Sequence, residues 1–423
     1  MKKIFKFILI ALLAFAIKPV SAQEVEGTPT DTLGAAVNKL QSAIELMQRF
    51  KITGYLQAQS QFSDSIGNAF AGGAFPAGTD KRFKVRRGRL KFAYNTLLTT
   101  FVAQIDVTES GFGTKDMYLV VRDPWTQTVS LTGGVFNRPF GYEVAYSSSQ
   151  LESPERARFT QALFPGEEDL GWMVTIQGAK TSTWNWLRIQ GGYFEGNGIN
   201  PVSKKMKDFI GQISISKTAM DERIKYGIGA SYYNGGVLET TANTYVLNNG
   251  LYSKDANQVA GQFAKRQYAG LDAQFSAESG LGLTTIRGEY LSGKQPSVAG
   301  SANSFTANPT GDLYLRNIMG AYGILIQAIK GTKHQIVLKY DVFDPNTKVS
   351  GDQIGVKATG FNATTAGDIK YTTTGIGWIY AYDANVKLMA YYDIVKNETS
   401  KNLAGYGRNL KDNVFTLRLQ YKF

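Results

Sequence analysis

The sequence predicts an all-β fold: a sixteen-stranded antiparallel transmembrane β-barrel preceded by a short N-terminal coiled-coil helix. From residue 52 to residue 423, apolar and polar side chains alternate with a period near 2, as in strands whose two faces meet different environments. The connections between these segments alternate between short and long. That alternation is typical of barrels with short turns on one side of a membrane and long loops on the other.

The composition favours strands and turns over helices. The 423 residues include 24 Phe, 23 Tyr and 45 Gly, and no stretch rich in Pro or Ser divides them into domains. The chain has no Cys, which excludes disulfides, and His334 is its one histidine, so the usual zinc sites lack ligands. We therefore expect no metal, no cofactor and no enzyme activity.

Residues 1–22 have the layout of a secretory signal peptide. Lysines at positions 2, 3 and 6 precede an apolar run from Phe7 to Ile17, and Val20-Ser21-Ala22 offers a cleavage site. A membrane anchor is the alternative, but the apolar run is short for a membrane span. Cleavage after Ala22 removes four lysines and no acid, which lowers the formal charge from +12 to +8. We expect export to the bacterial outer membrane.

Residues 23–51 are predicted to be a periplasmic segment that contains a helix over about residues 32–50. Its apolar residues are spaced 4, 3, 4 and 3 apart, which is the seam of a two-heptad coiled coil: Leu33, Val37, Leu40, Ile44 and Met47. A short amphipathic helix packed on its own domain is the alternative. Because two heptads are marginal alone, self-association through this seam would need help from the rest of the protein.

The last segment shows the alternation most clearly. One face carries Phe415, Leu417, Leu419, Tyr421 and Phe423, and the other carries Thr416, Arg418, Gln420 and Lys422. Counting such segments gives about sixteen strands between residues 52 and 423. A soluble β-sandwich is the alternative for the whole chain, but sandwiches rarely combine so many strands with an aromatic C-terminal residue.

The segment FKVRRGRLKFAY, residues 83–94, places many cations in one strand. In a barrel, Leu90, Phe92 and Tyr94 would face lipid. The three cations of the other face would point into a watery lumen: Arg87, Arg89 and Lys91. Lys84 and Arg86 share the outward register, so we expect them above the bilayer or at a subunit contact.

Several stretches resemble the phosphate-selective porin O and P family of Gram-negative outer membranes. FKVRRGRLKF is similar to that family's Arg-rich segment, and GGVFNRPFGYE, residues 133–143, is similar to the entry of its third loop, followed here by LESPERARFTQALFP and LGWMV. The resemblance covers most of residues 52–423. In one respect the chain departs from the family, whose phosphate-selective members fold a periplasmic turn into the lumen. The last short turn here, residues 382–385, looks too small for that.

The resemblance implies a trimeric porin barrel whose third loop, about residues 137–169, folds inward as a constriction. It implies that Arg87 and Arg89 join a cationic ladder along the lumen. The residues that would lie on or beside the constriction loop are Arg138, Glu143, Glu155, Arg156 and Arg158. An ordinary surface loop with solvated charges is the alternative for this segment.

The alternation extends the candidate anion path to ten inward cations: Arg87, Arg89, Lys91, Arg122, Arg188, Lys225, Arg287, Lys339, Lys387 and Arg418. Guanidinium groups bind oxyanions through two hydrogen bonds, and a ladder lets an anion pass between weak sites. Acids share this surface: Asp106, Asp116, Asp272, Glu289, Asp341 and Asp393. The cations could therefore instead brace the wall through paired charges.

We thus predict an outer-membrane porin that passively conducts small hydrophilic solutes and favours anions, with phosphate and polyphosphate as candidates. A general non-selective diffusion porin is the second hypothesis, and a structural or adhesin barrel the third. The expected partners are two further copies in a homotrimer, outer-membrane lipid and lipopolysaccharide, and small anionic or polar solutes. No nucleic-acid partner is expected, because the basic residues alternate with apolar ones over many strands.

Overall fold

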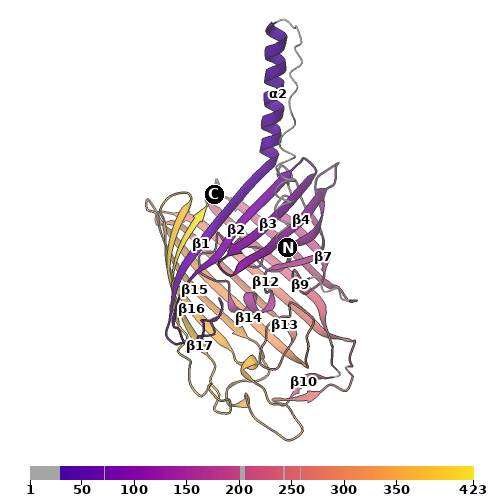
Figure 1. Ribbon diagram of the computed structural model, residues 1–423, viewed down its shortest axis with the longest axis vertical. Helices are drawn as coiled ribbons and strands as arrows, with labels where there is room; N and C mark the ends of the chain where they lie inside the picture. The colour runs from indigo at the N-terminus through magenta and orange to yellow at the C-terminus, as the bar shows by residue number, and fades with distance from the viewer. Residues whose placement is uncertain (1–28, 71, 201–204, 242, 258) are drawn as a thin grey trace, which may run out of the picture. The chain divides into compact units, whose positions relative to one another are not determined.

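The computed structural model describes residues 29–70, 72–200, 205–241, 243–257 and 259–423 (Figure 1). The predicted signal peptide, residues 1–22, lies outside the described residues, as does the start of the predicted periplasmic segment. The described chain falls into two compact units, one containing the N-terminal helix and the other formed by residues 50–423.

The N-terminal unit contains helix α2 (Pro29–Arg49), which confirms a short helix before the barrel. Four of its five predicted seam residues are exposed, with Leu40 at 62% and Met47 at 75%; the side chain of Leu33 is outside the described set. The coiled coil stays a prediction, because a single chain offers no second helix. Among the described residues, no helix is long and apolar enough to cross a membrane.

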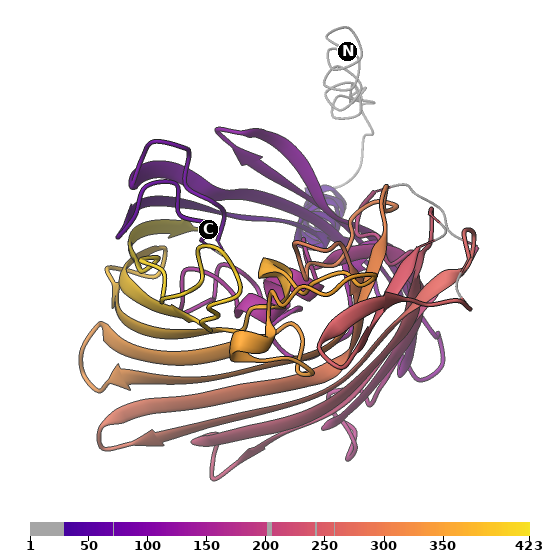
Figure 2. The same cartoon turned by 90° about the horizontal axis from the view of Figure 1, so that it is seen from below.

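Within the described residues, sixteen strands form a closed antiparallel barrel, as predicted (Figures 1 and 2). Each strand pairs with its neighbours in sequence, and the last strand pairs with the first. The barrel strands are β1 (Phe50–Ser63), β2 (Lys81–Asn95), β3 (Thr99–Thr108), β4 (Gly111–Arg122), β5 (Val129–Asn137), β6 (Glu168–Gln177), β7 (Leu187–Phe194), β8 (Asp208–Ala219), β9 (Ile224–Leu238), β12 (Phe263–Ser279), β13 (Gly282–Ser297), β14 (Leu313–Ile329), β15 (His334–Asp344), β16 (Tyr371–Ala381), β17 (Val386–Asn397) and β18 (Val414–Lys422).

The long connections carry small elements of their own. β10 (Thr244–Asn248) and β11 (Leu251–Lys254) form a hairpin between β9 and β12, and β10 also pairs in parallel with the start of β14. The helix α3 (Arg158–Leu163) lies between β5 and β6, and two short 3₁₀ helices, η1 (Gly351–Gln353) and η2 (Ala366–Asp368), lie between β15 and β16. The connection between β3 and β4 is short, although the other connections at that end of the barrel, such as those between β1 and β2 and between β5 and β6, are long.

The strand faces follow the alternation of the sequence. In β18, Phe415, Leu417, Leu419 and Tyr421 are exposed on the outside, whereas Thr416, Arg418 and Gln420 are buried on the inside. Similar exposed apolar residues recur around the barrel, from Leu119 and Trp172 to Ile286, Leu338 and Ile376. Because all backbone groups pair between neighbouring strands, such a wall suits a hydrocarbon environment outside and a polar one inside.

A bulge in β2 corrects the predicted register of its first half. Gln57 pairs with Arg87 and Ala58 with Val85, so Arg86 is an extra residue on β2. Arg86 therefore points inward beside Arg87 and contacts Glu155, contrary to its predicted outward position. Lys84 lies opposite Gln59, whose side chain bonds Arg418 inside the barrel, so the outward prediction for Lys84 was wrong too.

The outward face provides a direct test of the membrane environment. We expect Leu338→Arg, in the middle of β15, to lower the free energy of unfolding from a lipid bilayer by roughly 2–4 kcal/mol, because the guanidinium would enter hydrocarbon. Denaturant titration of the protein folded into lipid vesicles measures this change.

The matched control is Ser214→Arg on β8, an inward position that adds the same charge to the lumen. We expect it to change stability much less. Equal losses for the two variants would contradict the assignment of the outer face to lipid.

Candidate functional site

The segment from Arg138 to Glu167, which connects β5 and β6, lies inside the ring of strands (Figure 2). Its helix α3 packs against β14 and β15. Apolar side chains anchor it: Phe140, Phe159, Leu163 and Phe164 are each at most 2% exposed. We refer to residues 138–167 as the inner loop.

Glycines in the wall make room for two rings of the inner loop. A Cβ at Gly270 of β12 would lie 2.8 Å from the ring of Phe140, and one at Gly320 of β14 would overlap the side chain of Phe159. Since real contacts of this kind do not fall below about 3 Å, any larger residue at these positions would push the ring away. The two glycines thus let the inner loop approach the β12–β14 wall closely.

A buried carboxylate joins the inner loop to the opposite wall. Glu155 accepts two hydrogen bonds from Arg86, at 2.6 and 2.7 Å, and lies 3.3 Å from Arg87 and 3.6 Å from Arg418. Burial raises the pKa of Glu155, but the charges of Arg86 and Arg87 outweigh burial and lower it to about 2. Because the pKa of Glu155 is lower in the folded protein than in the unfolded chain, its ionised carboxylate stabilises the fold. This stabilisation is complete above the ordinary pKa range of a carboxyl group and is lost as the pH falls through about 2.

Other carboxylates of the inner loop make further ion pairs. Glu143 lies 2.9 Å from Lys339 of β15 and also accepts bonds from the backbone of Ala157 and the hydroxyl of Thr160. Glu152 binds Arg287 of β13. Glu167 contacts three cations, namely Arg156 at 2.9 Å, Lys115 at 3.1 Å and Arg89 at 3.9 Å.

Wall side chains also bind the backbone of the inner loop. Arg418 donates to the carbonyl of Pro154 at 2.8 Å, and Gln420 donates to that of Ser149 at 3.0 Å. Lys387 reaches the carbonyls of Ser149 and Leu151, both at 3.3 Å. Cations of strands β2, β13, β15, β17 and β18 thus form a charged wall on which the inner loop is fixed.

The ten predicted pore cations therefore divide into two groups. Six contact the inner loop: Arg87, Arg89, Arg287, Lys339, Lys387 and Arg418, of which Arg87 and Arg418 are 2% and 1% exposed. The other four lie elsewhere on the inner wall. Lys91 is 3.7 Å from Asp116, Arg122 bonds Thr100, Arg188 bonds Gln177, and Lys225 is exposed near a short turn.

The cations of the inner loop itself have structural partners. Arg138 donates to the carbonyls of Pro165 and Glu167 and lies over the ring of Phe164. Arg156 donates to four groups within the inner loop, including the carbonyl of Tyr146 at 2.6 Å. Arg158 stacks on Tyr371 at 4.1 Å, and none of the salt bridges in the described part of the chain involves it.

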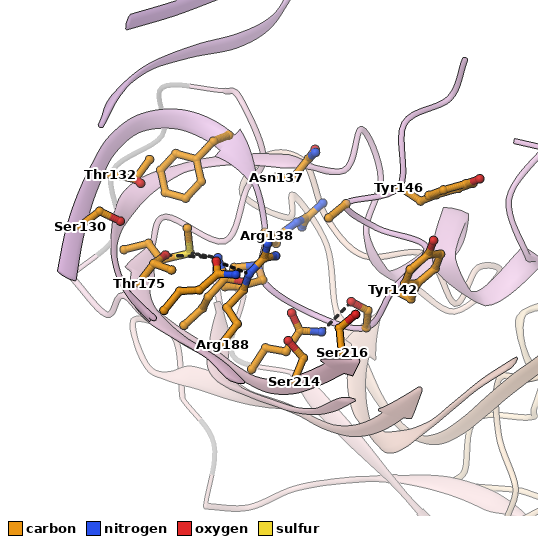
Figure 3. A pocket seen from close by; sticks show the side chains of 18 of the residues that line it. Ser130, Thr132, Asn137, Arg138, Tyr142, Tyr146, Thr175, Arg188, Ser214 and Ser216 are labelled. Atoms are coloured by element: carbon orange, nitrogen blue, oxygen red, sulfur yellow. Dashed lines mark hydrogen bonds between the residues drawn. The ribbon is translucent and has the colours of Figure 1, made fainter. Parts of the chain in front are cut away.

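A cavity of about 650 Å³ lies between the inner loop and the side of the barrel that this loop leaves uncovered (Figure 3). Its wall comes from the inner faces of β4–β8 and β12, and the inner loop contributes residues from Arg138 to Tyr146. Figure 3 shows Ser130, Thr132 and Thr175 around one part of this cavity, and Ser214 and Ser216 at another. A second cavity of about 380 Å³ lies beside Arg158, Gln161 and Tyr371.

The neutral residues of the larger cavity carry no charge and form no motif, so the sequence did not mark them as site residues. They are serines, threonines and glutamines at inward positions of successive strands, such as Ser130 and Thr132 on β5 and Gln212 and Ser214 on β8. These residues lie at inward positions of the period-2 pattern, but the prediction selected charged residues, most of which lie on other strands. Lys115 of β4, which pairs with Glu167 and Glu168, was also absent from the predicted site residues.

No group of three or more His, Cys, Asp or Glu side chains in the described ranges is arranged to hold a metal ion. The chemistry of the inner surface is therefore that of paired charges, amides, hydroxyls and aromatic rings.

No family model matches the chain, and no curated protein matches its sequence. Among solved structures it is similar to OmpT, an outer-membrane protein of Vibrio cholerae in its trimer form, with 11% identity over 88% of this chain and 99% of that one, and a TM-score of 0.51. It is also similar to Salmonella typhi OmpF in complex with daunomycin, with 10% identity over 88% and 97% and a TM-score of 0.52.

A third similar structure is the outer-membrane channel DcaP of Acinetobacter baumannii, with 12% identity over 88% and 97% and a TM-score of 0.50. At these identities the likeness shows the fold alone, which is that of Gram-negative outer-membrane porin barrels.

Because Glu155 pairs with several buried guanidinium groups, we expect its replacement by the neutral glutamine to weaken the attachment of the inner loop. Glu155→Gln should lower the free energy of unfolding by about 3–5 kcal/mol, because Arg87 and Arg418 would stay buried without a carboxylate. Denaturant titration in lipid vesicles at neutral pH gives the value.

Asp352→Asn serves as the control, since it removes a carboxylate from an exposed pair with Lys401 whose N–O distance is 3.8 Å. We expect little change there, as is usual for surface ion pairs. A loss for Glu155→Gln no larger than that of the control would show that the buried cluster does not hold the inner loop.

Proposed function

We propose that the chain is a passive outer-membrane porin for small hydrophilic solutes. The observation that carries this proposal is the closed barrel with an apolar outer face, whose interior keeps a cavity of about 650 Å³ beside an inward-folded loop. Such a wall needs no backbone partner from lipid, and its polar interior can hold water and solutes. Outer-membrane lipid and lipopolysaccharide would surround it.

The charges beside the cavity favour a weak preference for anions. Three cations line it, Lys91, Arg138 and Arg188, against two acids, Asp116 and Asp272. A small excess of positive charge raises the local concentration of anions without holding any of them tightly.

A phosphate-selective pore is the finer hypothesis from the sequence, but the contacts support it less than a general diffusion pore. Arg87 shares Glu155 with Arg86, and Arg89 lies beside Asp106 and Glu167. A guanidinium already paired with a carboxylate has fewer donors for an oxyanion. Among the ten predicted cations, the anion preference would thus depend on Lys91 and Arg188 at the cavity more than on Arg87 and Arg89.

We further propose that three copies assemble, with the exposed stripe of helix α2 at their shared seam. The trimeric form of the similar Vibrio cholerae protein supports a trimer. The stripe itself, Val37, Leu40, Ile44 and Met47, is exposed in the single chain, as expected of a seam that awaits a partner.

The first prediction from this proposal concerns ion selectivity. In planar bilayers under a potassium chloride gradient, the protein should conduct with a reversal potential on the anion side. Arg188→Ala should move that potential toward zero, because the excess charge at the cavity is lost. The control is Lys401→Ala, an exposed loop cation that should leave the potential unchanged.

Absence of any conductance would contradict the proposed porin function and favour the hypothesis of a structural or adhesin barrel. An unchanged potential in Arg188→Ala would overturn the role given to this residue while keeping the pore.

The second prediction concerns assembly. Leu40→Asp with Ile44→Asp should reduce the number of subunits measured by light scattering in detergent, because both residues lie on the proposed seam. Asn38→Asp with Gln41→Asp adds the same charge off the seam and should leave assembly intact. If the seam variant keeps its subunit number, helix α2 is not needed for assembly.

A further inference from the structure

The uncovered wall of the lumen differs in chemistry from the wall that holds the inner loop. On β5–β8, the inward positions beside the cavity are mostly neutral and polar: Ser130, Thr132, Thr175, Gln190, Gln212 and Ser214. Arg188 is the one charged residue that these four strands contribute to the lining of the cavity in the described structure. The space open to a solute thus borders hydroxyls and amides more than charges.

Several of these groups have capacity for a ligand. The hydroxyls of Ser130, Thr132 and Ser214 make no hydrogen bond with any described residue, although Thr132 is only 6% exposed. The amide nitrogen of Gln190 donates to Thr175 at 3.3 Å, and that of Gln212 donates to the carbonyl of Gly141 at 2.7 Å. These bonds orient the two amides, and neither amide oxygen accepts a hydrogen bond from a described residue.

Aromatic rings border the same cavity. Tyr118 and Phe136 pack edge to face with centroids 6.0 Å apart, Trp186 contributes from β6–β7, and Tyr142 faces in from the inner loop (Figure 3). The hydroxyl of Tyr118 bonds no described residue, and Tyr142 lies beside Arg287, whose guanidinium carbon is 5.4 Å from the centre of its ring. Each ring therefore offers an apolar surface with a polar tip, which suits a ligand that has both C–H faces and hydroxyls.

The charges at the cavity are few and do not form a cluster of one sign. Lys91 lies 3.7 Å from Asp116, whereas Asp272 accepts a bond of 2.6 Å from the neutral amide of Gln274 and Arg188 donates to the amide oxygen of Gln177. An ion entering this space would lose water and meet single charges of both signs, not a set of opposite charges. A neutral solute rich in hydroxyls could exchange its water for hydroxyl and amide partners at little cost.

From these contacts we infer that the uncovered wall binds neutral polyhydroxylated solutes, the chemistry of short saccharides, during their passage. The inference rests on the proposed porin function and names the solute class of that same lumen. A volume of about 650 Å³ lies within the range of small-molecule sites and accommodates a short oligosaccharide. Hydroxyls and amides would satisfy the sugar's polar edges, while Tyr118, Tyr142 and Trp186 would pack on its C–H faces.

The test is the current through the full-length protein in planar bilayers in potassium chloride, with raffinose added. We expect raffinose to block the current reversibly and with saturation. Polyethylene glycol of matched size lacks an array of hydroxyls, so it should reduce the current only in proportion to its concentration. The doubly truncated Thr132→Ala with Ser214→Ala should weaken the raffinose block by about 5- to 10-fold.

Ser110→Ala with Thr181→Ala is the matched control, because it removes two hydroxyls from exposed turns, and its raffinose block should equal that of the unchanged protein. Equal effects of raffinose and polyethylene glycol on the unchanged protein would overturn the inference and leave the porin standing. This comparison decides the matter even if the cavity variant fails to fold.

A block that saturates but is unaltered in a folded cavity variant would also overturn the assignment to this wall. Absence of potassium chloride conductance would instead overturn the porin itself, and the inference with it. The two failures are therefore distinguishable within one set of recordings.

Discussion

The position of the inner loop depends on one buried carboxylate. Glu155 lies among Arg86 and Arg87 of β2 and Arg418 of β18, and Arg418 also donates to the carbonyl of Pro154. Removing the carboxylate from such a cluster leaves several guanidinium charges without compensation in a buried environment, so the cluster depends on Glu155. The inner loop is consequently held against one side of the lumen, and the remaining space lies on the other side.

This placement separates charge from free volume. Inward cations of β2, β13, β15 and β18 bind the inner loop. The strands with serines, threonines and glutamines, β5–β8, face the cavity. A solute in the lumen would therefore meet the neutral wall. For this reason a general pore with affinity for hydroxyl-rich solutes agrees better with the contacts than an oxyanion ladder does.

The position of the inner loop depends on glycines in the barrel wall as well as on charges. Phe140 lies over Gly270 of β12 and Phe159 over Gly320 of β14. The aromatic contacts secure the inner loop alongside ion pairs from the neighbouring strands β13 and β15. Together they explain why a segment with four acidic residues can lie inside a barrel: each buried carboxylate finds a donor, and the rings fill the gaps.

The sequence by itself determined the barrel, because alternation is a local property. Lipid outside and polar groups inside constrain every second residue, so the number of strands, the outward face of β18 and the short helix before the barrel could be read without coordinates. It also indicated which connection would fold inward, through its resemblance to known loops. The bulge at Arg86 was not readable, since one extra residue changes the register without changing the composition.

Only the tertiary structure decided which inward cations are free. Arg87 and Arg188 look alike in the sequence, yet one is buried against Glu155 and the other borders the cavity. The difference arises from contacts between residues far apart in the chain, such as Glu155 with Arg418. Such contacts depend on where the inner loop comes to rest, and that position is the sum of many side-chain fits that no local pattern contains.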